Sequence, residues 1–328
     1  MIRAVDLGFG NVKAISPARQ IEYPSAIGTF RPVRFTTGME AQELKEKLCV
    51  EFEGKRYFIG DIAYTQAAPR VTMNSKRFTS SEGLALMISA LILLAKSQIE
   101  EIKLVAGLPV NEYAGLKEDY KNTLKSSHYI KLISTDGKES EFYRFEIEEV
   151  RVLPQPIGTL FNAVLDDTGQ LADKKLAGSR LAVIDIGKHT VDLILTDGLV
   201  FVDKSSTSYN DLGLYESYKD ICLVLKDTGY DIAPDSLEPF IRGKRTLPDL
   251  PQIKEMAFAN LAEKIVTRVI NAWPDLFTFD RIYITGGGSE VVGSYIAKAL
   301  ECSQMMINDN ATMTNCKGFY KYGKRVFE

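Results

Sequence analysis

The 328-residue chain is long enough for two domains or for one large domain built by internal duplication. Its 45% hydrophobic and 25% charged residues exclude a disordered, collagen-like or coiled-coil protein and indicate a globular protein with ample material for a core. The 40 basic and 43 acidic residues give a net charge of -3, so the chain has no basic field to bind nucleic acid directly. We expect it to reach any DNA partner through another protein.

Targeting signals and soft metal sites are not expected. The first residues include the acidic Asp6 and no apolar run, which is unlike a signal peptide. The most apolar stretch, residues 83–95, is too short to span a bilayer and predicts a buried helix. Four scattered cysteines and two histidines favour neither disulfides nor a zinc site. We therefore expect a cytoplasmic protein without a membrane partner, and any metal should be a hard cation held by oxygens.

Strand-like and helix-like segments alternate along the first half, which predicts an α/β protein. The pair Asp136-Gly137 predicts a hairpin turn, and Asn111 is expected to cap the helix after residues 107–109. The expected elements are strands at 2–5 and 12–15, a hairpin at 51–59, a helix at 82–98, a strand at 102–105, and strands at 128–133 and 142–152.

The second half repeats this alternation. Residues 229–251 contain four prolines and predict a surface excursion. The other expected elements are strands at 181–184, 191–195 and 200–202, helices at 212–226 and 253–272, a strand at 281–285 and a helix at 290–300.

An internal repeat relates the two halves. Residues 4–15 and 183–194 share one pattern: an apolar pair, Asp, an apolar residue, Gly, three turn residues and a second strand. Asp6 aligns with Asp185, and each copy lies near the start of its half. We interpret the pattern as two duplicated halves.

An Asp-x-Gly hairpin suits phosphate chemistry. The strand places a carboxylate at its end, the glycine lets the backbone approach a ligand, and successive N–H groups form a nest for an anion. Two facing hairpins would clamp a triphosphate, with Asp6 and Asp185 directed toward its Mg²⁺ through water. Lys13 on the outgoing strand could add positive charge at the phosphates. The simpler alternatives are turn-capping aspartates and a solvated lysine.

Three consecutive glycines, 286–288, join a strand to a helix, which suits close approach of the backbone to a ligand. The alternative is a tight turn without a ligand. A dinucleotide fingerprint is excluded because Val291 occupies its last glycine position. The Walker A-like residues 318–324 are spurious because Arg325 replaces Ser or Thr. No Ser/His/Asp or Cys/His arrangement is evident.

These segments resemble those of a known superfamily. Residues 6–13 resemble the first phosphate loop of the actin, Hsp70 and sugar-kinase ATPases, residues 184–192 the second, and residues 285–290 the adenosine loop. Within that superfamily the chain is similar to the ParM/StbA type of bacterial actin, which segregates plasmids. Further similar segments are residues 23–25, 57–61, 106–110 and 314–319.

The resemblance implies an actin-like fold, of the duplicated ribonuclease H-like kind, with two domains flanking a nucleotide cleft. Domain I would comprise residues 1–157, with 310–328 packing back on it, and domain II residues 158–309. It also implies ATP, or GTP, with Mg²⁺ held through Asp6 and Asp185, which with Gln155 form the catalytic set. The implied nucleotide-binding residues are Gly8, Gly10, Asn11, Lys13, Gly187, Lys188, His189, Thr190, Gly213, Gly286, Gly287, Gly288 and Glu290.

Gln155 matches the Gln or Glu that orients the attacking water in these proteins, and a neutral amide can position water for in-line attack. One departure concerns the second loop, which commonly reads Asp-x-Gly-Gly-Thr-Thr but here has Lys188 and His189 after Gly187. Lys188 could add charge near the phosphates or point to solvent. A histidine at a strand edge is more typical of a structural residue than of a general base.

The resemblance implies a nucleotide-dependent, filament-forming ATPase. Binding would close the domains, head-to-tail contacts would give filaments, hydrolysis would weaken them, and a ParR-like adaptor on plasmid DNA would bind the filament end. One alternative is a small-molecule kinase of the same superfamily, although no carboxylate base for a substrate hydroxyl is evident. Another is an actin-like scaffold that binds nucleotide without hydrolysis.

Overall fold

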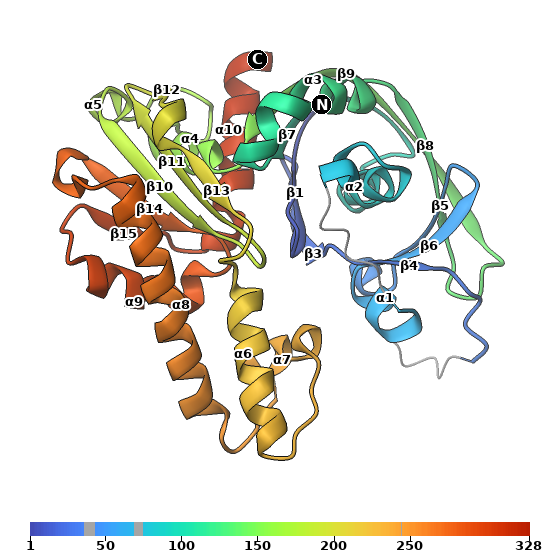
Figure 1. Ribbon diagram of the computed structural model, residues 1–328. Coiled ribbons are helices and arrows are strands. Elements are labelled where there is room, and N and C mark those ends of the chain that lie inside the picture. The colour runs from blue at the N-terminus through green and yellow to red at the C-terminus, as the bar shows by residue number, and fades with distance from the viewer. Residues whose placement is uncertain (36–42, 69–74, 244) are drawn as a thin grey trace. The chain divides into compact units, whose positions relative to one another are not determined.

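The computed structural model describes residues 1–35, 43–68, 75–243 and 245–328 (Figure 1). They form two compact units, Met1–Ala172 with Asn315–Glu328, and Asp173–Thr314. These boundaries differ from the expected 157/158 and 309/310. The helix α4 (Ile157–Val164) belongs to the first unit because its Thr159 donates hydrogen bonds from N and Oγ1 to Asn315 Oδ1, at 3.2 and 2.8 Å.

The first unit contains a mixed sheet in the order β3-β2-β1-β7-β9-β8-β5-β6-β4. β1 pairs antiparallel with β2 and parallel with β7, which pairs parallel with β9. The Asp136-Gly137 turn joins the antiparallel β8 and β9, as predicted. The strands are β1 (Ile2–Leu7), β2 (Asn11–Ile15), β3 (Gln20–Pro24), β4 (Ile27–Thr29), β5 (Cys49–Phe52), β6 (Lys55–Ile59), β7 (Ile99–Leu108), β8 (Ser127–Ile133) and β9 (Ser140–Pro154).

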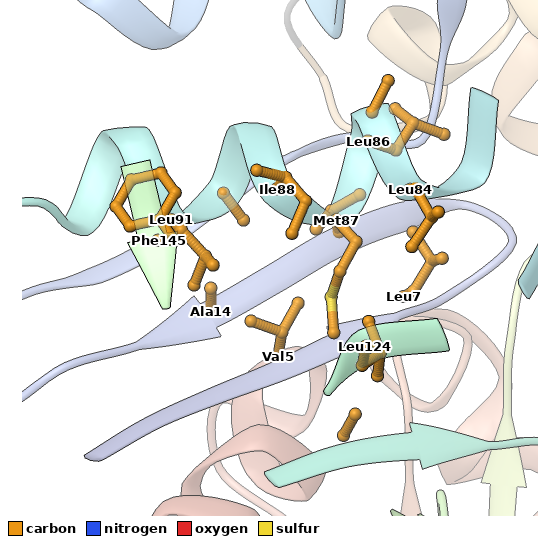
Figure 2. Packing of buried hydrophobic residues seen from close by; sticks show 14 of the residues in the cluster. Val5, Leu7, Ala14, Leu84, Leu86, Met87, Ile88, Leu91, Leu124 and Phe145 are labelled. Carbon is orange, nitrogen blue, oxygen red and sulfur yellow. The ribbon is translucent and has the colours of Figure 1, made fainter. Parts of the chain in front are cut away.

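The predicted buried helix is α2 (Ser81–Leu94), which lies within the curve of this sheet (Figure 1). Ser80 caps it by accepting a hydrogen bond from the Gly83 N–H at 3.1 Å. Every residue from 83 to 94 is buried, since the helix is apolar on all sides. Figure 2 shows Met87 and Leu91 directed toward the hairpin of β1 and β2. The side chains of α2 thus pack against the hairpin, and burial of each contributes about 2 kcal/mol to the free energy of folding.

The first unit contains six other helical segments among the described residues. α3 begins directly after Pro109, which is its N-cap residue and offers no side-chain cap. The expectation that Asn111 caps this helix is therefore wrong, because Asn111 already lies inside the first turn. The segments are η1 (Leu44–Glu46), α1 (Asp61–Gln66), η2 (Ser75–Phe78), α3 (Val110–Leu124), α4 and α10 (Thr314–Phe327).

The second unit has a smaller sheet in the order β12-β11-β10-β14-β15, with β13 also paired to β11. β10 pairs antiparallel with β11 and parallel with β14. Its strands are β10 (Arg180–Ile186), β11 (Val191–Asp197), β12 (Val200–Phe201), β13 (Thr207–Tyr209), β14 (Arg281–Thr285) and β15 (Met305–Ile307). Its helical segments are α5 (Lys174–Ala177), η3 (Asp203–Ser205), α6 (Leu214–Asp227), η4 (Pro234–Ser236), α7 (Glu238–Ile241), α8 (Leu250–Ala272), η5 (Leu276–Thr278), α9 (Ser289–Leu300) and η6 (Ala311–Met313).

The predicted excursion, residues 229–251, is not wholly superficial. Leu237 and Ile241 are buried in the core of the second unit, so η4 and α7 are anchored to it. Lys244 of this stretch lies outside the described residues. Among the helices that the structure describes, none combines the length and apolarity needed to cross a bilayer.

Both copies of the sequence repeat form the same substructure. Each is an antiparallel hairpin whose first strand pairs in parallel with a third strand, β1–β2 with β7 and β10–β11 with β14. The predicted mixed α/β class with a repeated motif in its two halves is confirmed.

Candidate functional site

The predicted site residues fall into two groups, one in each unit. We call the end of the β1–β2 hairpin with Gln155 the first hairpin site, and the end of the β10–β11 hairpin with the glycines of residues 286–288 the second hairpin site.

Asp6 is the centre of the first hairpin site. It lies on β1 directly opposite Lys13 of β2, and it is 2% exposed. Gln155 Nε2 donates a hydrogen bond to Asp6 Oδ1 at 2.7 Å, and Lys13 Nζ lies 3.4 Å from Asp6 Oδ2. Gln155 is placed there by its own backbone, whose N–H donates to Leu108 O at 2.8 Å. Two predicted residues, Lys13 and Gln155, therefore meet at the buried carboxylate of a third, Asp6.

The turn between the two strands is held by its carbonyl groups. Ser25 Oγ donates to Gly8 O at 2.6 Å, and the Ser25 N–H donates to Gly10 O at 2.9 Å. Gly8 has no room for a side chain, because a Cβ would lie 2.8 Å from Asn11 O. The Asn11 side chain itself donates to Glu22 Oε1 at 2.6 Å, so it is tied to β3.

Arg77 is a residue of this site that the sequence did not reveal. Its guanidinium is 2% exposed and donates from Nη2 to Gly8 O at 3.3 Å, with its carbon 4.9 Å from the centre of the Phe9 ring. Burial lowers the pKa of Arg77 to about 10, and the nearby Tyr120 and Asp6 partly offset this. Arg77 remains protonated at neutral pH. No local sequence motif predicts this role, because Arg77 is distant from Gly8 in the sequence and only the tertiary fold brings the two together.

The second hairpin site carries two acidic side chains. Asp185 on β10 lies directly opposite Asp192 on β11, and the two are 9% and 3% exposed. Ser208 of β13 donates a hydrogen bond from Oγ to Asp192. Asp192 was not among the predicted site residues. The internal repeat contained the signal for it, because Asp192 aligns with Lys13.

The three glycines lie against the end of β10. Gly286 has φ +84°, and a Cβ there would lie 2.3 Å from Asp185 Oδ1. A Cβ on Gly288 would lie 2.4 Å from Ile186 Cγ2, whereas one on Gly287 would make only an ordinary contact at 3.4 Å. Close packing thus accounts for two of the glycines. It also brings the bend beside the predicted catalytic carboxylate.

The loop of residues 187–190 contacts the start of α6. A Cβ on Gly213 would lie 2.3 Å from His189 Cα, so only glycine allows this approach. The N–H groups of Leu214 and Tyr215 donate to Gly187 O and Lys188 O at 3.2 and 2.8 Å. The loop also closes on itself, because the Gly187 N–H donates to Thr190 O at 2.8 Å. The predicted residues 187–190 and 213 are therefore brought together.

Two predicted side chains of this site make ion pairs with the 229–251 excursion. Lys188 Nζ lies 2.8 Å from Asp235 Oδ1, and the Lys188 side chain is 19% exposed, so it does not simply point to solvent. Glu290 accepts a hydrogen bond from Arg242 Nη1 at 2.6 Å. The His189 ring packs 4.8 Å from the Tyr215 ring, measured between centroids, which is a structural contact.

The acidic groups suit a magnesium ion bound mainly through water. Among the described residues, no group of three or more His, Cys, Asp or Glu side chains is placed to hold a metal. Mg²⁺ keeps several waters and is commonly bound by one or two carboxylates plus substrate phosphates. Asp6, or Asp185 with Asp192 beside it, could supply such carboxylates, and the nucleotide would supply the phosphates.

Comparisons with known proteins relate both units to actin-like proteins. Residues 4–158 match the family model "Actin like proteins N terminal domain", and residues 183–298 match "Archaeal actin homologue MreB-like, C-terminal". No curated protein matches the sequence.

Several solved structures share the fold. The chain resembles ParM in a 15-stranded filament from Clostridium botulinum, with a TM-score of 0.79, 23% identity and 99% of both chains covered. It resembles the actin-like protein Alp7A with a TM-score of 0.79 and 15% identity, over 98% of this chain and 95% of that one. It also resembles the archaeal actin homologue Ta0583 in complex with ADP, with a TM-score of 0.78, 17% identity and 99% of both chains covered.

Proposed function

Since this chain belongs to the actin-like proteins, we propose that it is a nucleotide-dependent, filament-forming ATPase. The observation that carries the proposal is the buried Asp6 carboxylate, held between the Lys13 ammonium and the Gln155 amide at the end of a glycine turn. This combination offers a positive charge for phosphate, a carboxylate for hydrated magnesium and an amide for water.

The orientation of Gln155 supports a role in hydrolysis. Its amide nitrogen donates to Asp6, so Oε1 faces away from that carboxylate and can accept a hydrogen bond from a water molecule. A neutral amide that orients water is sufficient in phosphoryl transfer, where catalysis is mostly positioning and charge stabilisation. In this proposal Gln155 positions the attacking water, while Asp6 and Asp185 orient the Mg²⁺ of ATP or GTP through water.

The glycines of the second hairpin site would bind the rest of the nucleotide. Gly286 lies beside Asp185 and Gly213 lies beside the loop 187–190, and in this proposal the backbone of residues 286–288 and 213 approaches the ribose and base. Magnesium, when bound, would neutralise charge on the phosphates. The ADP complex of Ta0583 supports nucleotide binding in a protein of this fold.

Filament formation is proposed from the fold and from relatives whose structures are filaments, ParM of C. botulinum and Alp12. We further propose that the filament moves DNA through a DNA-bound, ParR-like adaptor. The net charge of -3 agrees with this indirect route, because such a surface does not attract DNA by itself.

The metal assignment is tested by Asp185→Asn, which keeps the shape of the side chain and removes its charge. We expect magnesium-dependent phosphate release to fall about a hundredfold, since a lost metal-orienting charge costs on the order of 3 kcal/mol of transition-state stabilisation. The matched control is Asp197→Asn, an exposed carboxylate at the far end of the same hairpin, which should release phosphate at the wild-type rate.

ADP formation and phosphate release should both be measured with and without added sugars, together with nucleotide binding, because a kinase would form ADP and a sugar phosphate without releasing phosphate. Equal activity of Asp185→Asn and wild type would contradict the metal assignment. Turnover that requires a sugar would identify a kinase instead, and binding without any ADP formation or phosphate release would identify a scaffold.

A further inference from the structure

The carbonyl of Gly8 has two donors that reach it from distant parts of the first unit. Ser25 Oγ lies 2.6 Å from this oxygen, and Arg77 Nη2 lies 3.3 Å from it. The two donors are also linked to each other, with Arg77 Nη2 3.4 Å from Ser25 Oγ. One peptide group of the turn is thus held by a strand end and by the helical segment η2.

Anchoring this carbonyl also fixes the following N–H group. In a trans peptide the C=O of one residue and the N–H of the next point in opposite directions. Because the Gly8 carbonyl is directed to Ser25 and Arg77, the Phe9 N–H is directed to the other side of the turn. The Ser25 N–H holds the Gly10 carbonyl in the same way at 2.9 Å. Such aligned N–H groups form the anion nest of a phosphate loop.

Arg77 also contributes charge. Arg77 is buried, and its guanidinium carbon lies beside two aromatic rings, 4.9 Å from the centre of Phe9 and 5.7 Å from that of Phe78. A buried cation is screened less than an exposed one, so its potential extends to the turn that it contacts. The same packing keeps the guanidinium in one position, because aromatic faces leave little freedom for the planar group.

We propose that Arg77 and Ser25 are positioning residues that hold the turn of residues 8–10 in its phosphate-binding shape before any nucleotide arrives. The inference rests on the proposed function, since it requires that this turn binds a nucleotide phosphate. Neither residue is proposed to contact the reacting atoms. We expect Arg77 and Ser25 to control the part of the nucleotide affinity that comes from the phosphates.

The test compares the affinities of ADP and adenosine by calorimetry, because only ADP engages the turn. For Arg77→Met, we expect ADP to bind roughly ten- to a hundredfold more weakly, the range for a lost charge-assisted hydrogen bond. Adenosine affinity should stay within about twofold, since the nucleoside makes no use of an anion nest. Arg77→Lys should recover part of the loss, and Ser25→Ala should show a smaller loss with the same selectivity for ADP.

The matched control is Arg3→Met. Arg3 is also a fully buried arginine of the first unit, but it pairs with Glu100 at 2.7 Å and does not contact the turn. Its replacement should leave the ratio of ADP to adenosine affinity unchanged. An equal loss of ADP preference in Arg3→Met would overturn the inference, because general loosening would then be the cause.

The outcomes separate this inference from the proposed function. If wild type prefers ADP over adenosine and the Arg77 and Ser25 variants keep that preference, the positioning role is wrong and the proposed function stands. If wild type binds neither, both fail. If Arg77→Met does not fold, Arg77→Lys and Ser25→Ala decide, and full ADP preference in both would overturn the inference.

Discussion

Gly286 and Gly287 are neighbours in the sequence but differ in what surrounds them. Gly286 has a left-handed backbone, and a Cβ there would overlap Asp185 Oδ1, whereas Gly287 has neither constraint. The structure therefore requires glycine at position 286, whereas a side chain at position 287 would make only an ordinary contact.

We predict that Gly286→Ala lowers the free energy of unfolding by about 2–4 kcal/mol, through the strained φ and the overlap with Asp185. Gly287→Ala is the control and should cost less than about 1 kcal/mol. Denaturant unfolding of the two variants measures this difference. Equal stability would show that the bend is not packed against Asp185 as described.

The 229–251 excursion links two segments of the second unit that are predicted to bind nucleotide, through Lys188 and Glu290. Asp235 of η4 pairs with Lys188, and Arg242, just after α7, pairs with Glu290. Tyr218 of α6 donates to Glu238 of α7 at 2.6 Å, and Glu238 pairs with Arg242 at 2.8 Å. Two residues from the middle of the excursion, Asp235 and Arg242, thus join it by ion pairs to residues 188 and 290.

If Lys188 binds phosphate, it must first leave Asp235. We therefore predict that Asp235→Asn raises the affinity for ATP about two- to fivefold, because an ion pair of this exposure is worth less than about 1 kcal/mol. Calorimetry with Asp235→Asn, Lys188→Met and the double variant forms a double-mutant cycle. In the Lys188→Met background, Asp235→Asn should no longer raise the affinity for ATP. Asp231→Asn, an exposed carboxylate on the same excursion, is the control. Unchanged or weaker ATP binding in Asp235→Asn would indicate that Lys188 only connects its loop to the excursion and does not bind phosphate.

The elements differ in how far the sequence could predict them. The meeting of Asp6 and Lys13 follows from strand alternation, because a short turn places them directly opposite each other. Gln155 could be placed only through a family resemblance, since nothing local distinguishes it from a loop residue. Arg77 and the partner of Lys188 could not be predicted, because tertiary packing alone brings η2 to Gly8 and η4 to the loop.

At the scale of the whole molecule, the duplicated hairpins have diverged in charge. The cross-strand pair is Asp6 with Lys13 in the first unit and Asp185 with Asp192 in the second. With Arg77 beside its turn, the first hairpin has two cationic side chains near one carboxylate, whereas the second has two buried carboxylates. The first copy therefore carries more positive charge and the second more negative charge, and both kinds of charge are of use to a protein proposed to bind a magnesium nucleotide.

The most direct measurement of the central claim is sedimentation of the wild-type chain with MgATP, with MgADP and without nucleotide, with phosphate release followed in the same samples. We expect the protein to pellet with MgATP, to stay in the supernatant without nucleotide, and to leave the pellet as ATP is consumed. Protein that stays in the supernatant under every condition, or that pellets equally without nucleotide, would contradict the claim.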